Sequence, residues 1–169
     1  MIVLAISIVL SFHEYAPRRP CSTDSDNKST KYERLSADVK PTHYKLLITP
    51  SLKTFTFKGK VDIDIDIRKE IDRVKLHSVG LDVRRAEVTI NGGNVISDCH
   101  VEYGNEMITV VPSTIITAGV AKISLEFSGN LNNQPNGFYR SKYLIGEKEE
   151  FLACTQFEST SARQAFPCF

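Results

Sequence analysis

The sequence predicts an all-β domain, an antiparallel β-sandwich with one short helical turn near its C-terminus. The clearest observation lies in residues 57–68, where four apolar side chains at odd positions from Val61 to Ile67 alternate with aspartates. A period of two is typical of a strand with one buried face and one solvated face. Short apolar runs separated by turn residues fill most of the remaining chain, and no segment has a long helical period.

The other expected strands are short apolar runs bounded by turn residues. Asn91-Gly92-Gly93 predicts a hairpin, because these residues tolerate positive φ. Gly146 and Glu147 predict a second hairpin between the last two strands. Only residues 160–165 favour a helix, of one or two turns, with Ser159 or Thr160 as its N-cap. We expect strands over residues 44–48, 73–77, 81–90, 95–103, 107–111, 121–127, 137–143 and 150–157.

The aspartates at positions 62, 64 and 66 are expected to face solvent. A calcium loop would need a glycine at the next position, where Ile67 stands, and a flat strand cannot surround an ion. Lys or Arg residues are expected across the ladder, such as Arg73, Lys75 or Arg84. The expected core comprises Leu46, Ile48, Val61, Ile63, Ile65, Ile67, Ile123, Leu125, Phe127, Leu152 and Cys154.

Composition excludes several classes of function. The net charge of +1 gives no electrostatic case for binding nucleic acid. His43, His77 and His100 fall on separate expected strands without metal-ligand spacing. We therefore expect no catalytic residue, no metal ligand and no cofactor in this chain. The four cysteines show no C-x-x-C spacing and are interpreted as free thiols, those at 154 and 168 as buried ones: Cys21, Cys99, Cys154 and Cys168.

Residues 1–31 are interpreted as an N-terminal extension, either signal-like or disordered. Residues 2–10 form an apolar run that is too short to span a bilayer as a helix. This run could be the apolar part of a signal peptide, although no basic residue precedes it. Residues 12–30 are polar and rich in Ser and Asp, which is typical of a linker.

The candidate site lies near the end of the chain. An apolar strand over residues 151–154 is followed by Gln156 and Glu158. Residues i and i+2 of a strand share a face, so these two side chains are expected to converge, with Glu158 partly exposed. A carboxylate beside a neutral amide can hold an ammonium group, such as a peptide N-terminus. The residues alone equally allow two polar side chains that merely finish a strand at a solvated edge.

The last residues, 155–169, read T-Q-F-E-S-T-S-A-R-Q-A-F-P-C-F. This run resembles T-Q-F-E-x-T-D-A-R-x-A-F-P-C of the zinc aminopeptidase family, which includes aminopeptidase N and puromycin-sensitive aminopeptidase; Ser161 stands where Asp is usual. The E-R-L run at residues 33–35 and the G-F-Y-R-S-K-Y run at residues 137–143 are also similar to that family. The resemblance covers residues 32–169, the N-terminal β domain, with its C-terminal end truncated.

The resemblance implies a saddle-like β domain that precedes a thermolysin-like catalytic domain. In the family, that second domain holds zinc through H-E-x-x-H and contacts substrate through G-A-M-E-N, and this chain contains neither motif. Gln156 would line the pocket for the first side chain of the substrate, and Glu158 would hold the free α-amino group of the peptide. The expected partners are therefore peptide N-termini and the catalytic domain, with zinc only in the full-length parent and this chain inactive alone.

Two alternatives remain open at this point. The chain is either a part of a zinc aminopeptidase or a stand-alone β module that binds or regulates without a catalytic role. The puromycin-sensitive branch is mainly cytosolic, which implies a cytoplasmic location, whereas a signal over residues 2–10 would make the protein secreted or membrane-associated.

Overall fold

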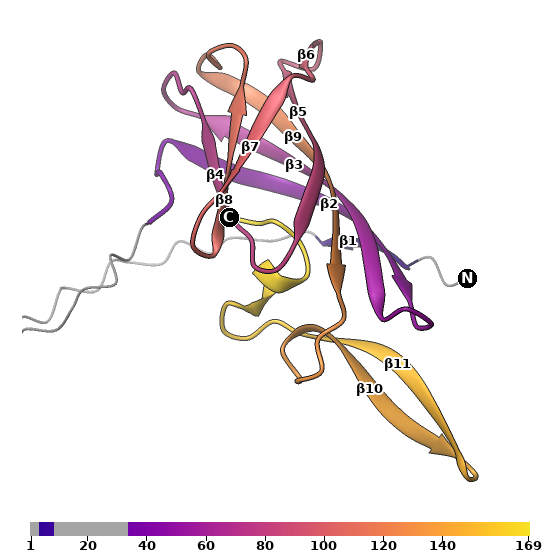
Figure 1. Ribbon diagram of the computed structural model, residues 1–169. Helices are drawn as coiled ribbons and strands as arrows, with labels where there is room; N and C mark the ends of the chain where they lie inside the picture. The colour runs from indigo at the N-terminus through magenta and orange to yellow at the C-terminus, as the bar shows by residue number, and fades with distance from the viewer. Residues whose placement is uncertain (1–3, 9–33) are drawn as a thin grey trace, which may run out of the picture.

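The computed structural model describes residues 4–8 and 34–169. Within these residues the chain forms three antiparallel sheets, of six, three and two strands (Figure 1). The six-stranded sheet has the order β1-β2-β3-β9-β5-β6, the three-stranded sheet β4-β8-β7, and β10 pairs only with β11. The bounds are β1 Leu4–Ile8, β2 Val39–Ser51, β3 Thr56–Ile67, β4 Val74–His77, β5 Asp82–Ile90, β6 Asn94–Ile96, β7 Cys99–Tyr103, β8 Met107–Pro112, β9 Gly119–Asn130, β10 Gly137–Ile145, β11 Lys148–Gln156 and a 3₁₀ turn η1 Ser161–Gln164. The predicted all-β class is confirmed.

Strand β3 lies inside the six-stranded sheet, between β2 and β9. Its alternating pattern gives one apolar face, and Val61, Ile63 and Ile65 are completely buried there. The register aligns Val61 with Leu46 of β2 and with Leu125 of β9, so that buried residues of all three strands stack on the same face. The predicted strand and its inward face are confirmed.

The three-stranded sheet covers this apolar face. Val74 and Leu76 of β4 and Ile108 and Val110 of β8 are buried in the same hydrophobic cluster as the residues of β3. The two sheets form the layers of a sandwich, with β4, β7 and β8 in front of the larger sheet in Figure 1.

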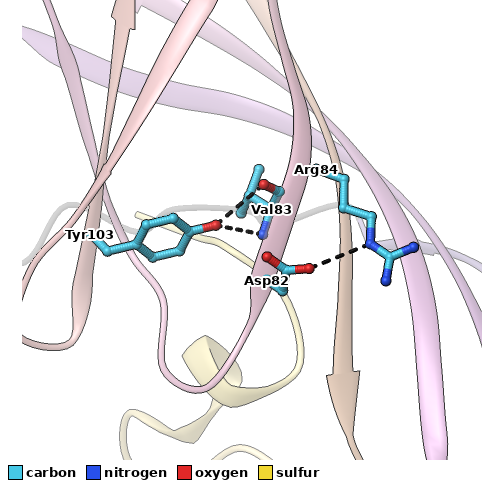
Figure 2. Close-up of polar contacts among 4 residues, drawn as sticks. All are labelled: Asp82, Val83, Arg84 and Tyr103. Atoms are coloured by element: carbon cyan, nitrogen blue, oxygen red, sulfur yellow. Dashed lines mark hydrogen bonds and ion pairs between the residues drawn. The ribbon is translucent and has the colours of Figure 1, made fainter.

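A tyrosine hydroxyl links the two sheets. Strand β6 pairs only with residues 88–90 of β5, so it does not extend along the edge of β5 to Val83. The hydroxyl of Tyr103, from β7, accepts a hydrogen bond from the Val83 N–H (2.8 Å) and donates one to the Val83 carbonyl (3.2 Å), as Figure 2 shows. On the same stretch Arg84 pairs with Asp82 at 3.4 Å. Tyr103 therefore satisfies backbone groups that a neighbouring strand would otherwise pair.

The β10–β11 hairpin projects from the end of the sandwich (Figure 1). Its root is aromatic: Phe138 packs edge-on against Phe57, with ring centroids 5.0 Å apart, and Phe151 packs against Phe55 at 4.9 Å. The guanidinium of Arg140 lies 3.9 Å from the centroid of the Phe55 ring. The hairpin is thus attached to the sandwich through Phe55, in the segment that joins β2 to β3, and through Phe57 near the start of β3.

Two predicted local structures differ from the observed ones. The strand expected over residues 95–103 is two strands, β6 and β7, which belong to different sheets, because the chain crosses between layers at residues 97–98. The C-terminal helical turn is present, but Thr160 precedes it without a side-chain capping bond. The hairpin at Asn91 is confirmed, with positive φ at Asn91 and Gly92.

The predicted core is largely confirmed, with an exception in the last strand. Leu152 is 39% exposed, and Cys154 is only partly buried. In β11 it is Ala153 that packs against the core, because the hairpin projects and turns the face of Leu152 away from the sandwich. Ile48 is half-buried and packs against the core from β2.

A basic residue does face the aspartates across the ladder, as predicted, but it is none of the three residues that were suggested. Strand β9 lies beside β3, and it supplies the partners: the Lys122 ammonium lies 3.7 Å from the Asp64 carboxylate, and the Ser124 hydroxyl donates to Asp62 at 2.7 Å. Sheet order, which the pattern of a single strand does not contain, decided this pairing. Arg73 instead pairs with Asp72, Arg84 pairs with Asp82, and Lys75 lies on β4 of the other sheet.

The N-terminal apolar run contributes β1, which pairs with β2 from Leu4 opposite Ile48 to Ile8 opposite Tyr44. The rest of the predicted extension, with Cys21 and the linker, lies outside the described residues, so the signal and linker interpretations stay predictions. Among the described residues, no helix has the length and apolar character needed to cross a membrane.

Replacing Ile65 with Asp tests the core. Ile65 is completely buried, and an unpaired carboxylate there should cost about 5 kcal/mol, comparable with the whole stability of a small domain. Far-UV circular dichroism during urea unfolding would measure the loss. Val120→Asp is the matched control, because Val120 lies on β9 of the same sheet and is 59% exposed. If Ile65→Asp unfolds at the same urea concentration as wild type, the inward face of β3 is wrongly assigned.

Candidate functional site

Gln156 and Glu158 lie where the hairpin ends. Gln156 is the last residue of β11, and Glu158 lies in the turn over residues 158–160 that follows. Both side chains are exposed. The strand therefore stops before Glu158, and the predicted shared strand face does not reach it; a turn, not strand alternation, positions the carboxylate.

The packing of the Phe157 ring directs the turn of the chain at this point. Its half-buried ring packs edge-on against Phe166, with centroids 6.0 Å apart, while the two polar residues on either side of it remain exposed. The Phe157 carbonyl accepts a hydrogen bond from the Ser161 N–H at 2.8 Å, which closes the turn. One aromatic contact thus directs the chain inward and keeps Gln156 and Glu158 outside.

The turn after Glu158 is held against the root of the hairpin. Gly137 pairs with Gln156 across the hairpin and has φ 67°, and a Cβ there would lie 2.6 Å from the Cβ of Gln164 in η1. The Asn132 amide donates to the Gln164 side-chain oxygen at 2.7 Å and to the Asn136 carbonyl at 2.6 Å. Sequence reasoning did not identify Asn132 or Gln164 as supports, because their contact joins residues that are 32 positions apart in the chain.

The final residues are anchored in the seam between the two sheets. Ala165, Phe166 and Pro167 are buried. His77 of β4 and Cys168 exchange two backbone hydrogen bonds of 2.7 and 3.0 Å. The Phe169 N–H donates to the Tyr44 hydroxyl at 3.0 Å, so the exit segment contacts both layers.

The ionisable groups around this exit are held neutral by burial. Burial raises the pKa of the Cys168 thiol to about 11, and it also raises the pKa of Tyr44. Burial, followed by the charge of Arg163, lowers the pKa of His77, whose Nδ1 is buried without a hydrogen bond to any described residue. These groups support the fold, and none of them is an activated nucleophile at neutral pH.

The described residues offer no set of metal ligands. Nowhere in residues 4–8 and 34–169 do three or more His, Cys, Asp or Glu side chains gather around one point. His43, His77 and His100 lie on β2, β4 and β7, as predicted. The thiols of Cys99, Cys154 and Cys168 are free and partly buried. These residues do not fit a zinc ion, which requires three or four convergent ligands.

Comparison with known proteins identifies the family. Residues 40–169 match the family model described as the Peptidase M1 N-terminal domain. The chain belongs to this family. It is 35% identical over 144 residues to puromycin-sensitive aminopeptidase of Caenorhabditis elegans, a match that covers 83% of this chain. It is 33% identical over 177 residues to aminopeptidase 2 of Candida albicans, covering 95% of this chain, and 34% identical over 142 residues to endoplasmic reticulum aminopeptidase 1 of Homo sapiens, covering 80%.

The relatives are much longer than this chain. The M1 N-terminal domain described here spans 15% of the worm relative, 19% of the yeast relative and 15% of the human relative.

The burial of Cys168 predicts a loss of stability in alkali. The Cys168 thiol has a pKa of about 11 in the folded protein and about 9 when it is exposed. As the pH rises above 9, this thiol therefore loses its proton in the unfolded chain before it does so in the folded protein. The Cys168 thiol alone should lower the free energy of unfolding by about 2 kcal/mol between pH 8 and 10.5. Urea unfolding at both values measures this loss, and Cys168→Ala should lack that share of it. An equal loss in Cys168→Ala would show that the thiol does not cause it.

Proposed function

We propose that this chain is the substrate-facing β domain of a zinc-dependent aminopeptidase that removes N-terminal residues from peptides. The observation that supports this most directly is an exposed, unpaired carboxylate at Glu158, two residues after Gln156, inside the matched M1 N-terminal domain. The β domain supplies contacts to the N-terminus of the substrate, and another domain of the same enzyme supplies the chemistry.

The charge of Glu158 is available to a ligand. Its side chain makes no ion pair and no hydrogen bond with any described residue. The nearest arginine along the chain, Arg163, is already engaged: its guanidinium donates to the Thr160 carbonyl at 3.0 Å and contacts Glu106 at 3.3 Å. An ammonium group arriving at this turn would therefore find a carboxylate without an internal partner.

Gln156 is suited to a different task. Its neutral amide both donates and accepts hydrogen bonds, so it can line a pocket without fixing the charge of the group that enters. Its backbone is held opposite Gly137 at the hairpin root, two residues before Glu158. We assign to Gln156 a contact with the first side chain of the substrate, and to Glu158 the contact with its free α-amino group.

This arrangement would select for peptide ends. A free N-terminus presents an ammonium group to Glu158, whereas an internal peptide bond presents none. Once a covering domain excludes water from the turn, a carboxylate without a partner is costly, so substrates that lack the ammonium are rejected.

The zinc of the proposed parent enzyme would be held outside this domain. The described residues contain no grouping of three metal ligands, and the sequence contains no H-E-x-x-H motif. Bound zinc would polarise the scissile carbonyl and activate water in such an enzyme. The residues of this chain would orient the substrate N-terminus and would make no contact with the metal.

In a full-length enzyme that carries this domain, Glu158→Ala should reduce kcat/KM for peptides with a free N-terminus by about tenfold to a hundredfold. A hydrogen bond to a charged group contributes about 1.5–3 kcal/mol, which corresponds to this range. Steady-state kinetics with free and N-acetylated peptides measures both the loss and the remaining preference. Unchanged kinetics, or an unchanged ratio between the two substrates, would contradict the assignment.

Gln156→Ala is the matched comparison within the same motif. It should alter the relative kcat/KM among substrates that differ in their first side chain and preserve the requirement for a free amine. A variant that lost the amine requirement instead would show that the two roles are exchanged.

The 169-residue chain by itself should neither retain zinc after dialysis nor hydrolyse an aminoacyl anilide. Zinc at functional affinity needs convergent ligands that the described residues do not provide. Metal analysis and an anilide assay with and without a chelator test this. One tightly held zinc per chain, or turnover that the chelator abolishes, would contradict the proposed division between domains.

A further inference from the structure

The turn that carries Glu158 has little support of its own. Residues 158–160 are all exposed, and Thr160 precedes η1 without a side-chain capping bond. The Ser161 N–H closes the turn on the Phe157 carbonyl. An exposed turn with a single closing bond opens readily, and a group that must orient a substrate needs support from residues around it.

Arg163 reaches back to this turn from η1. Its Nε donates to the Thr160 carbonyl at 3.0 Å, and its Nη1 donates to the Glu106 carboxylate at 3.3 Å. The Arg163 side chain is only 16% exposed, whereas most arginine side chains lie in solvent. A buried charge requires a partner, and Glu106 supplies it from 57 positions earlier in the chain.

The backbones of both members of this ion pair are held by the segment that joins β4 to β5. The Val79 N–H donates to the Arg163 carbonyl at 2.8 Å, and the neighbouring Ser78 N–H donates to the Glu106 carbonyl at 3.0 Å. In Figure 1 the yellow C-terminal segment passes beside the end of β4, where these bonds are made. The arginine and the carboxylate therefore meet on a fixed frame.

Glu106 has a backbone conformation that is unusual for its residue type. Its φ is 57°, in the left-handed region that residues other than glycine seldom adopt. Such a conformation persists only where the surrounding contacts fix it, and it is frequent at functional sites. Here one residue gives its carbonyl to Ser78 and its carboxylate to Arg163.

We propose that Arg163 is the positioning residue for Glu158 and that Glu106 holds Arg163 in this role. The proposal rests on the proposed function, because a carboxylate that must meet a substrate ammonium needs a fixed turn. Arg163 holds the end of the turn at Thr160, and the packing of Phe157 holds its start. Because the charge of Arg163 is paired with Glu106, it supports the turn without neutralising Glu158.

Amide hydrogen exchange in the 169-residue chain, followed by NMR, tests the support without relying on activity. Arg163→Ala should speed exchange of the Ser161 N–H about tenfold, because the bond that closes the turn loses its neighbouring contact. The Val79 N–H is the internal control: it bonds to the backbone carbonyl of Arg163, which the substitution retains, and its exchange should be unchanged.

Variants of Glu106 test the same contact with Arg163 left in place. Glu106→Ala should speed exchange of the Ser161 N–H by a smaller factor, about threefold, because the carboxylate is 61% exposed and exposed ion pairs stabilise weakly. Glu106→Gln retains an acceptor oxygen and should restore most of the protection. Arg85→Ala is the matched control, since it removes a different ion pair, with Glu87 on β5, and should leave Ser161 unchanged.

Kinetics in a full-length enzyme that carries this domain test the role in recognition. A misplacement of about 1 Å can cost about a hundredfold, and a loosened turn should cost less, so Arg163→Ala should lower kcat/KM for free peptides about tenfold. The ratio between free and N-acetylated peptides should fall with it. In a Glu158→Ala background the same change should have little further effect, because Arg163 acts through Glu158.

Equal increases in exchange at Ser161 and Val79, or none at Ser161, would overturn the proposal, since the arginine would then support the whole exit segment or nothing. Losses of kcat/KM from Arg163→Ala and Glu158→Ala that simply add would overturn it too. The proposed function fails separately, if Glu158→Ala alone leaves the kinetics unchanged, and the exchange measurement then still decides whether Arg163 holds the turn.

Discussion

Burial of one face of β3 is the constraint on which the rest of this domain depends. The residues at positions 61, 63 and 65 are completely buried, and each buried aliphatic side chain contributes about 1.5–3 kcal/mol. Flanking glycines let aromatic rings join this core: a Cβ at Gly59 would lie 2.3 Å from Cζ of Phe127, and one at Gly129 would lie 2.6 Å from Cζ of Phe57. The ring of Phe57 then contacts Phe138, which attaches the hairpin to the core.

Contacts with that core fix the position of the candidate site. The hairpin ends at Gln156, and the exit segment returns to the seam between the sheets, where His77 and Tyr44 bind it. Glu158 lies between these two fixed points, on a turn that the packing of Phe157 keeps short. A site on a turn held at both ends is more precisely placed than one on a free loop, which suits a group that must orient a peptide N-terminus.

In the proposed enzyme, recognition and chemistry belong to different domains. This domain offers an amide at the end of one hairpin and a carboxylate in the turn that follows, and its described histidines lie apart on three strands. In such an enzyme the β domain would select the end of the peptide that enters the active site. The metal site of the other domain would cleave the bond.

The sequence alone determined the fold class, the inward face of β3 and the motif that contains Gln156 and Glu158, because alternation, turn residues and short motifs are local signals. Only the tertiary structure decided that Lys122 faces Asp64, that residues 95–103 divide between two sheets, and that Leu152 faces outward. It also placed Asn132 against Gln164 and ended β11 before Glu158. These features depend on which strands become neighbours and where a hairpin leaves the core, and both are set by contacts between residues far apart in the chain.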